Sequence, residues 1–225
     1  MDQIALRNPG THEVDYEEWY HATRHSNHFN EDYYDARAKI AVKKFFSGIG
    51  ENSRILDFGC GLGQNIFHMP NAMGYDISEY GINFCKSKGV NATTNLNDIP
   101  DEAFDVVFTA HVLEHHPHPK TMIEDMRKKL KKGSKLIIVI PFERHGKADF
   151  KLDLNQHLFS WNFRTLNNLL LTSGFEINEN KYIRGAGYFR LLPLAKINFG
   201  LYRWTTNTVS RLANIREIMV VATKM

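Results

Sequence analysis

Residues 54–64 read Arg-Ile-Leu-Asp-Phe-Gly-Cys-Gly-Leu-Gly-Gln, an apolar run followed by an acid and then by glycine at every second position. Glycines placed in this way let the backbone turn sharply and let a ligand approach the main chain without meeting a Cβ atom. Open α/β sheets bind nucleotide-like ligands where a strand runs into such a loop. The stretch therefore predicts a buried strand at 54–58 and a ligand-binding loop directly after it.

The spacing of the glycines distinguishes this loop from a dinucleotide site. A dinucleotide loop follows GxGxxG and carries an acid about 20 residues further on. Here Gln64 stands where the last glycine would be, and Asp76 lies only 13 residues past Gly63. Asp57, two residues before the first glycine, would be a poor neighbour for a pyrophosphate and suits a ligand with an amine and a sulfonium. A tight turn without a ligand is the remaining alternative.

The rest of the chain alternates between apolar strands and helical periodicity. Such alternation predicts an α/β fold in which a mostly parallel sheet has helices on both faces. Continuously apolar strands at 105–109 and 136–140 fit a sheet that is covered on both sides. The expected strands are 54–58, 72–76, 91–94, 105–109, 135–141, 175–183 and 217–223, and the expected helices are 31–47, 63–69, 79–88, 119–131 and 163–173.

Composition excludes several classes of protein. The chain has 225 residues, 43% hydrophobic and 24% charged, which is typical of one globular domain. No apolar run reaches the length of a membrane span, and the first 20 residues lack a signal-peptide core. The net charge of +3 is too small to indicate nucleic acid by itself, so no nucleic-acid partner is expected. Two cysteines do not make a disulfide framework, which favours a cytoplasmic location.

Two segments stand apart from the alternating core. Residues 1–30 are polar, aromatic and rich in histidine, and they are interpreted as an arm or lid before a single domain at 31–225. Residues 185–214 form an apolar and aromatic insertion, and no Asp or Glu occurs from Lys181 to Arg216. Basic residues interleaved with apolar ones suit an anionic amphiphile, a phosphate-bearing substrate or a membrane surface. The insertion is therefore a cap over the substrate, a peripheral membrane contact, or a packed helical element.

Five ordered segments resemble the motifs of class I S-adenosylmethionine-dependent methyltransferases. They are ILDFGCGLG at 55–63, GYDIS at 74–78, NLNDIP at 95–100, FDVVFTAHVLEHHPHP at 104–119 and KKGSKLIIVIP at 131–141. HLFSW to SGF, 157–175, is similar to the late helix and sixth strand of the small-molecule, type 11/12-like subgroup. The resemblance implies a Rossmann-like sheet of seven strands, with the last strand antiparallel and inserted beside the sixth.

The resemblance also implies the cofactor, S-adenosylmethionine, with S-adenosylhomocysteine as product, and residues that would bind it. Asp76 at the end of the second strand would accept the ribose hydroxyls, and Asn95 with Leu96 would meet the adenine. Asn95 replaces an acid that methyltransferases often carry there, but its amide oxygen can still accept from the adenine amino group. The remaining expected contacts are Tyr34, Asp57, Gly59, Cys60, Gly61, Gly63, Ile77, Ala110 and His111. Tyr33 and Arg37 lie on the same predicted helix as Tyr34 and could close over the cofactor's carboxylate.

His157 is the candidate catalytic residue. It follows the loop after strand 135–141, which opens toward the substrate pocket in this fold, and imidazole can take a proton from an attacking hydroxyl. Capping or packing of the late helix is the alternative role. The histidines at 115, 116 and 118 crowd one loop, but such a run is more often solvated or packed, so no metal is expected.

The expected function is methylation, by O-methyl transfer, of a small-molecule, sugar or lipid-linked acceptor, and the acceptor could be anionic. A quinone-type O-methyltransferase, an N-methyltransferase and a non-catalytic S-adenosylmethionine-binding protein are the alternatives. In-line approach of acceptor and methyl group would supply much of the rate.

Overall fold

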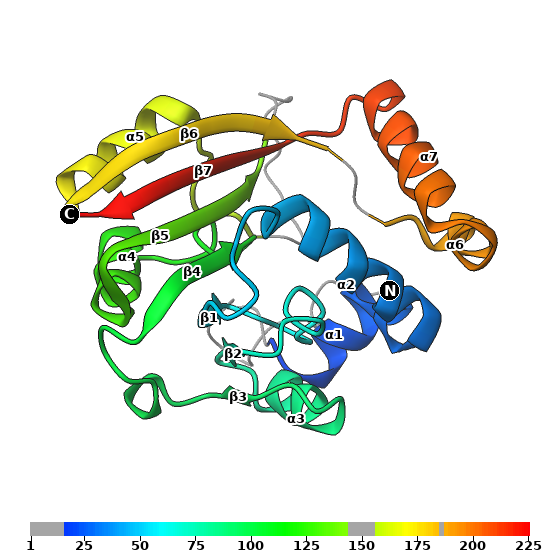
Figure 1. Ribbon diagram of the computed structural model, residues 1–225, viewed down its shortest axis with the longest axis horizontal. Coiled ribbons are helices and arrows are strands. Elements are labelled where there is room, and N and C mark those ends of the chain that lie inside the picture. Colours follow the sequence, from blue (N-terminus) through cyan, green and yellow to red (C-terminus); the bar gives the residue numbers. More distant parts are fainter. Residues whose placement is uncertain (1–15, 144–155, 185–186) are drawn as a thin grey trace.

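The protein is described by a computed structural model that covers residues 16–143, 156–184 and 187–225. Its centre is a seven-stranded sheet with the order β3-β2-β1-β4-β5-β7-β6 (Figure 1). β7 pairs antiparallel with both β5 and β6, while the pairs among β1 to β5 are parallel. The expected topology, with the last strand antiparallel beside the sixth, is confirmed. The strands are β1 (Ile55–Phe58), β2 (Ala72–Tyr75), β3 (Ala92–Thr93), β4 (Phe104–Ala110), β5 (Leu130–Pro141), β6 (Phe175–Ile183) and β7 (Glu217–Lys224).

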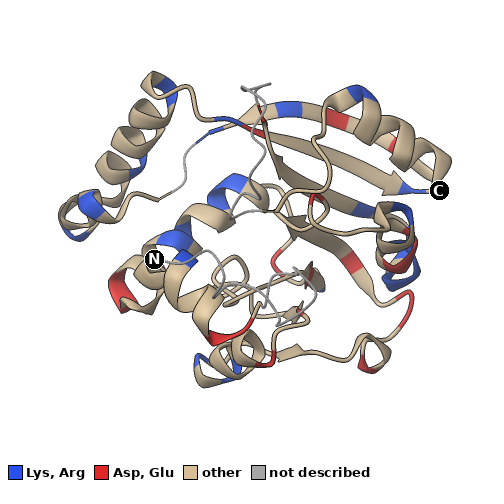
Figure 2. Ribbon diagram, turned by 180° about the vertical axis from the view of Figure 1, so that it is seen from behind, with Lys and Arg blue, Asp and Glu red and all other residues tan. Residues whose placement is uncertain are grey.

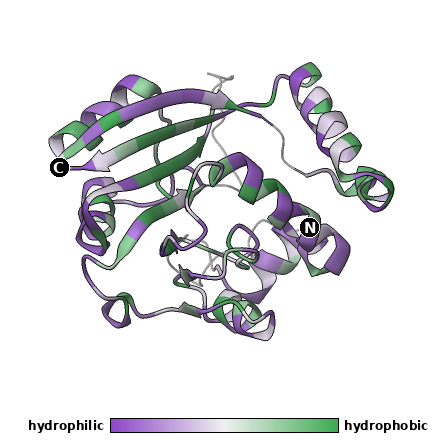
Figure 3. Cartoon of the chain, viewed as in Figure 1, coloured by the Kyte–Doolittle hydropathy of each residue, from purple (hydrophilic) through white to green (hydrophobic). Residues whose placement is uncertain are grey.

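Helices cover both faces of this sheet, and each face has its own apolar core. The helices are α1 (Glu18–Arg24), α2 (Glu31–Phe45), α3 (Glu79–Ser87), α4 (Pro119–Lys129), α5 (Phe163–Thr172), α6 (Leu192–Ile197) and α7 (Phe199–Leu212). Alternate side chains of a strand point to opposite faces, so Leu56 packs with α4 and α5 while its neighbour Ile55 packs with α2 and α3. Apolar residues accordingly fill the central strands in Figure 3.

The helix expected at 63–69 is wrong. Residues 61–68 form successive turns, with Ile66 N donating to Gly63 O at 3.2 Å and Met69 N donating to Ile66 O at 2.8 Å. Gly63 has a φ of +78°, which is outside the helical region, and Pro70 disfavours helical backbone at the residue before it. The link between β1 and β2 is therefore a compact loop.

The insertion expected at 185–214 contains a short 3-10 turn, η4 (Phe189–Leu191), and the helix pair α6–α7. This pair lies beside α2, away from the sheet (Figure 1). Its inner side forms a third apolar cluster in which Leu192 and Tyr202 pack with Tyr33, Ala36 and Ile40 of α2. The Tyr33 hydroxyl also donates to Gly187 O at 2.9 Å. The insertion is thus attached to the domain through α2.

Residues 16–30 of the expected arm form α1 and a 3-10 turn, η2 (Ser26–Phe29), and residues 1–15 lie outside the described part of the chain. None of the helices in the described ranges is long and apolar enough to cross a membrane.

Candidate functional site

A cavity of about 1350 Å³ opens at the carboxyl ends of β1, β2, β4 and β5. Ligands of open α/β sheets bind at this edge. The volume exceeds the roughly 300–1,000 Å³ of an ordinary small-molecule pocket, so the cavity has room for a nucleotide-like cofactor and an acceptor together. The arm covers it from the side of α2, through Tyr16, Tyr20, His21, Arg24, His25 and His28.

The glycine loop forms the floor of this cavity. Gly59 has a φ of +83°, and a Cβ atom there would lie 2.2 Å from Val112 Cγ2, so no larger residue fits. Gly61 has a φ of +53°, and a Cβ atom there would meet nothing closer than His21 Cε1 at 3.9 Å. The backbone of Gly61 is therefore open to a ligand. Gly59, Cys60 and Gly61 line the cavity, as the sequence predicts.

Two hydrogen-bonded supports hold the loop in place. Gly59 N and Cys60 N donate to Tyr75 O at 2.7 and 2.9 Å. From below, the buried Tyr34 hydroxyl donates to Leu62 O at 2.8 Å. Tyr34 is expected to contact the cofactor, yet it does not line the cavity, and its observed contact is with the loop. Gly63 is likewise outside the cavity lining, with Cys85 Sγ 2.8 Å from where its Cβ would be.

Asp76 stands at the carboxyl end of β2 and faces the cavity. Its Oδ2 accepts from Gly61 N at 2.7 Å and its Oδ1 accepts from Ser78 N at 3.0 Å. These bonds fix the carboxylate beside the glycine loop, and each oxygen retains a further lone pair. The position suits a carboxylate that accepts hydroxyl groups of a ribose, and the adjacent Ile77, 65% exposed, also lines the cavity.

Asp57 lies behind the loop and is completely buried. Neither of its carboxylate oxygens has a hydrogen-bond partner of ordinary length among the described residues, and the Asn65 side chain offsets only part of the effect of burial on its pKa. Burial, and next the negative charge of Asp76, raise the pKa of Asp57 to about 8. A buried acid without a partner is costly, and a ligand cation on the other side of the loop would reduce that cost. This orphaned carboxyl fits a ligand that carries an ammonium and a sulfonium.

Of the two residues expected to contact the adenine, Leu96 lines the cavity, whereas Asn95 does not. The Asn95 amide is engaged within its own loop, where Oδ1 accepts from Asn97 N at 3.1 Å and Nδ2 donates to Asp98 Oδ1 at 2.9 Å. These contacts cap the 3-10 turn η3 (Leu96–Asp98) and so position Leu96.

A chain of alternating charges lies beyond β4. Lys44 on α2 pairs with Glu217 of β7, and Glu217 Oε1 is 2.9 Å from His111 Nε2. The His111 Nδ1 atom is 3.5 Å from Glu114 Oε1. Burial opposes the charged imidazole, but the carboxylates of Glu114 and Glu217 prevail and raise the pKa of His111 to about 9. His111 is therefore a cation at neutral pH, and both it and Ala110 line the cavity.

His111 also has a φ of +58°, a strained conformation for a residue other than glycine. Its amide donates to Val139 O at 2.9 Å, which ties the turn to β5. The backbone turn directs the imidazole between the two carboxylates.

His157 lines the cavity next to this chain. Its Nδ1 atom is paired with the carboxylate of Glu143, and its ring centre lies 4.7 Å from that of His115 at an interplanar angle of 77°. A carboxylate at Nδ1 fixes the imidazole and presents Nε2 to a substrate. Glu143 was not predicted as a site residue, and no pattern in the sequence links it to His157.

The contribution of the arm was also only partly predicted. Glu17 accepts at the start of α3, from Ser78 Oγ at 3.2 Å and from the amides of Glu79 and Tyr80 at 3.1 and 2.8 Å. A carboxylate at a helix N-terminus is stabilised by the free amides and the helix dipole. This contact holds the arm over the cavity, where His21 is buried against the ring of Tyr80.

The predicted insertion lies apart from the cavity. No described residue of 187–214 is among those that line it. The described residues of the insertion approach the site through α2, where a Cβ atom at Gly187 would lie 2.7 Å from Cδ of Arg37, a cavity residue. A role as a cap over the substrate stays a prediction.

Comparison with known proteins identifies the family. Residues 17–180 match the sequence model of a methyltransferase-domain family. A tRNA U34 carboxymethyltransferase of Nautilia profundicola is 33% identical over 102 residues, which are 39% of this chain and 34% of that protein. The chain thus spans about a third of the length of that relative.

Two solved structures share the fold. A SAM-dependent methyltransferase from Archaeoglobus fulgidus has a TM-score of 0.58 at 21% identity, covering 92% of this chain and all (100%) of that one. Phosphoethanolamine N-methyltransferase 2 of Haemonchus contortus, in complex with S-adenosyl-L-methionine, has a TM-score of 0.58 at 16% identity, covering 94% and 60%. The family match shows that the chain belongs to the methyltransferase-domain family, and the solved structures show that its fold is shared with S-adenosylmethionine-dependent methyltransferases.

Proposed function

We propose that the protein transfers a methyl group from S-adenosylmethionine to a hydroxyl of a small-molecule, sugar or lipid-linked acceptor. The observation that carries this proposal is the Glu143–His157 pair at the cavity. A hydroxyl is a weak nucleophile until its proton is removed, and a carboxylate-oriented imidazole is suited to remove it. An amine acceptor would need less help of this kind.

The cofactor supplies an electrophilic methyl group on a sulfonium. We assign its ribose to Asp76, its amino-acid end to the glycine loop in front of Asp57, and its adenine to the surface of Ile77 and Leu96. This arrangement leaves the part of the cavity near His111, His115 and His157 for the acceptor. His157 Nε2 would accept the hydroxyl proton while Glu143 stabilises the resulting imidazolium.

The test is mass-spectrometric detection of methylated product across a panel of sugars, glycolipids, quinols, amines and tRNA. The His157→Asn and Glu143→Gln variants should lose at least about tenfold in kcat on the true acceptor, with unchanged affinity for S-adenosylhomocysteine. His116→Asn changes a cavity histidine outside this pair and should keep the wild-type rate. Full activity of His157→Asn would contradict the assigned base. Cofactor binding without product from any acceptor would favour the non-catalytic binding protein.

We further propose that the acceptor is presented at an anionic lipid surface by the insertion. Ile197, Leu201, Trp204 and Leu212 are 79, 45, 65 and 83% exposed. In Figure 2 the basic residues of this helix pair have no acidic neighbours on it. Exposed apolar side chains among cations are the composition of interfacial helices.

Sedimentation with vesicles of phosphatidylglycerol and phosphatidylcholine tests this contact. Binding should fall when Trp204 and Leu212 are both changed to Ser, while the buried cavity and cofactor affinity stay intact. Equal sedimentation of the variant would refute the contact. Cytoplasmic location remains part of the proposal. It is supported by two buried cysteines, neither of which forms a disulfide.

A further inference from the structure

Three side chains gather at the acceptor end of the cavity, and two of them, Glu114 and His115, have no role in the proton transfer proposed above. Ligand atoms of Glu114, His115 and His157 all lie within 4.8 Å of one another. The first two come from the loop after β4 and the third from the segment before α5. The sequence predicts no metal, because a histidine-rich loop alone is weak evidence. The structure buries Glu114 of that loop and brings His157 from a distant segment to it.

The Glu114 carboxylate gives independent evidence that something is held here. It is 1% exposed, and neither oxygen accepts a hydrogen bond from a described residue. Its nearest cationic groups are His111 Nδ1 at 3.5 Å and His115 Nε2 at 4.0 Å. A buried carboxylate is stable only when it is paired or bound to a metal. Both contacts are within ion-pair distance, but neither gives a carboxylate oxygen a hydrogen bond of ordinary length, so the oxygens can still bind a metal.

From this geometry we propose that Glu114, His115 and His157 bind one divalent transition-metal ion, such as zinc, at the acceptor end of the cavity. One carboxylate and two imidazoles are a ligand set that zinc and its neighbours in the first transition row prefer. Three protein ligands leave at least one position open, as in catalytic metal sites. The acceptor hydroxyl would occupy that position.

The surroundings of His157 fit this role. A histidine that binds a metal usually has its other ring nitrogen paired with a carboxylate or a carbonyl, which orients the ring. Glu143 occupies that place at His157 Nδ1, which leaves Nε2 for the ion. Ligands of a tetrahedral zinc ion lie about 3.4 Å apart, so small rotations of these side chains would close the site.

The chemical consequence deepens the proposed function and rests on it. A metal-bound hydroxyl loses its proton more readily than a free one. In the metal-bound protein, the acceptor O–H bond would break with its proton passing to solvent. The oxygen would then form a bond to the methyl carbon as the carbon–sulfonium bond breaks, and the electron pair of that bond stays on sulfur. His157 would then act as a ligand, and it would act as the proton acceptor only in the metal-free protein.

His111 competes with the ion for Glu114, because its Nδ1 atom lies 3.5 Å from Glu114 Oε1. Its other ring nitrogen, Nε2, is 2.9 Å from Glu217 Oε1, and Glu217 also pairs with Lys44. A divalent ion can therefore displace His111 from Glu114 while His111 keeps its contact with Glu217.

The test is calorimetric titration of the full-length protein, stripped with chelator, with Zn²⁺, followed by Co²⁺ absorption spectroscopy. We expect one ion per chain. Affinity should fall about tenfold or more in Glu114→Gln and in His115→Asn, and Glu143→Gln should lower it by about 10- to 100-fold through loss of the orienting carboxylate. Glutamine keeps the shape of the glutamate it replaces, asparagine keeps a polar group in place of the imidazole, and thermal melts check that each variant folds.

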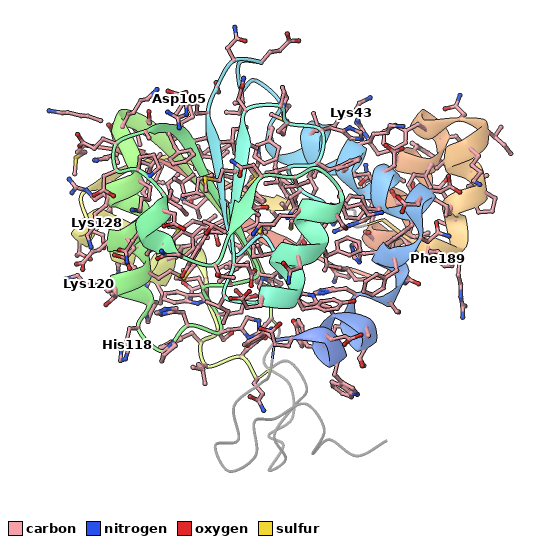
Figure 4. All side chains as sticks on the ribbon, turned by 90° about the horizontal axis from the view of Figure 1, so that it is seen from below. Lys43, Asp105, His118, Lys120, Lys128 and Phe189 are labelled. Carbon is pink, nitrogen blue, oxygen red and sulfur yellow. The ribbon has the colours of Figure 1, made fainter. Side chains whose placement is uncertain are left out.

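Two control variants test whether the metal ion binds to other histidines. His118 belongs to the same histidine-rich loop but points outward at the start of α4, next to Lys120 in Figure 4. His25 belongs to the separate histidine group of the arm. His118→Asn and His25→Asn should bind the ion as the wild type does. If Glu114→Gln and His115→Asn also retain wild-type affinity, or if the wild type binds no ion, the inference is overturned.

Failure of this inference is distinguishable from failure of the proposed function. S-adenosylhomocysteine titrations use a different part of the cavity and are made on the same metal-free protein. Product formation that is unaffected by chelator and by added Zn²⁺ would overturn the metal's role while leaving O-methylation in place.

Discussion

Replacing Gly59 with alanine tests two requirements of the glycine loop, a left-handed backbone and space beside Val112. The residue has a φ of +83°, and an added Cβ atom would lie 2.2 Å from Val112 Cγ2. The left-handed backbone alone costs an alanine about 1–2 kcal/mol. Ordinary contact begins near 3.4 Å, so the loop or Val112 must move by more than 1 Å, and overpacking of this kind costs about 1–3 kcal/mol.

Gly133 provides the matched control. Its φ is +75°, but an added Cβ atom would meet nothing within 4 Å. Gly133→Ala should therefore lose about 1–2 kcal/mol of unfolding free energy, while Gly59→Ala should lose about 2–5 kcal/mol. Urea denaturation measures both values.

The cofactor provides the second readout. Val112 and the loop both border the cavity. Displacement at Gly59 should therefore weaken the binding of S-adenosylhomocysteine by at least about tenfold, or 1.4 kcal/mol. Gly133→Ala should bind it as the wild type does. Equal stability loss in the two variants, or wild-type affinity in Gly59→Ala, would refute this account of the loop.

Three further predictions concern the supports of the site. Glu17→Ala removes the arm's hydrogen bonds to the start of α3, at a cost of about 1–2 kcal/mol, and should speed tryptic cleavage at Arg24; unchanged cleavage would show that the arm is held elsewhere. Tyr34→Phe leaves Leu62 O without its donor and should cost about 0.5–1.5 kcal/mol in a urea titration, and a loss of zero would mean that the bond does not support the loop. The raised pKa of Asp57 means that the folded protein holds a proton that the unfolded chain releases above about pH 4, so the stability of the cofactor-free protein should fall as pH rises from 5 to 8. In Asp57→Asn, the decrease in unfolding free energy from pH 5 to 8 should be smaller by a few kcal/mol. An identical pH profile for the two proteins would contradict this prediction.

Periodicity predicted the sheet because its signal is local and strong. Apolar strands such as 105–109 need both faces covered, and that requirement alone places helices around them. The failed helix at 63–69 shows the limit of this reasoning. Ile66 is buried and Phe67 and Met69 are half-buried, but Gly63 and Pro70 leave too little chain for a helix.

The sequence motifs identified cavity-lining positions where the residues directly follow a strand; their roles toward the cofactor stay predictions. Gly59, Gly61 and Asp76 stand at strand ends, so the fold brings them to one edge. The contacts that the sequence did not predict join distant segments: Glu143 with His157, His111 with Glu217, and Glu17 with α3. No short-range pattern encodes such pairs, because packing of the whole domain creates them.

The most direct test of the central claim is isothermal titration of the protein with S-adenosylhomocysteine, compared between Asp76→Ala and Asp125→Ala. Both acids line the cavity, but only Asp76 stands beside the glycine loop. We predict one micromolar site in the wild type and in Asp125→Ala, and at least about tenfold weaker binding in Asp76→Ala. Wild-type affinity in Asp76→Ala would contradict the assignment of the ribose, and absence of binding in the wild type would contradict the cofactor site itself.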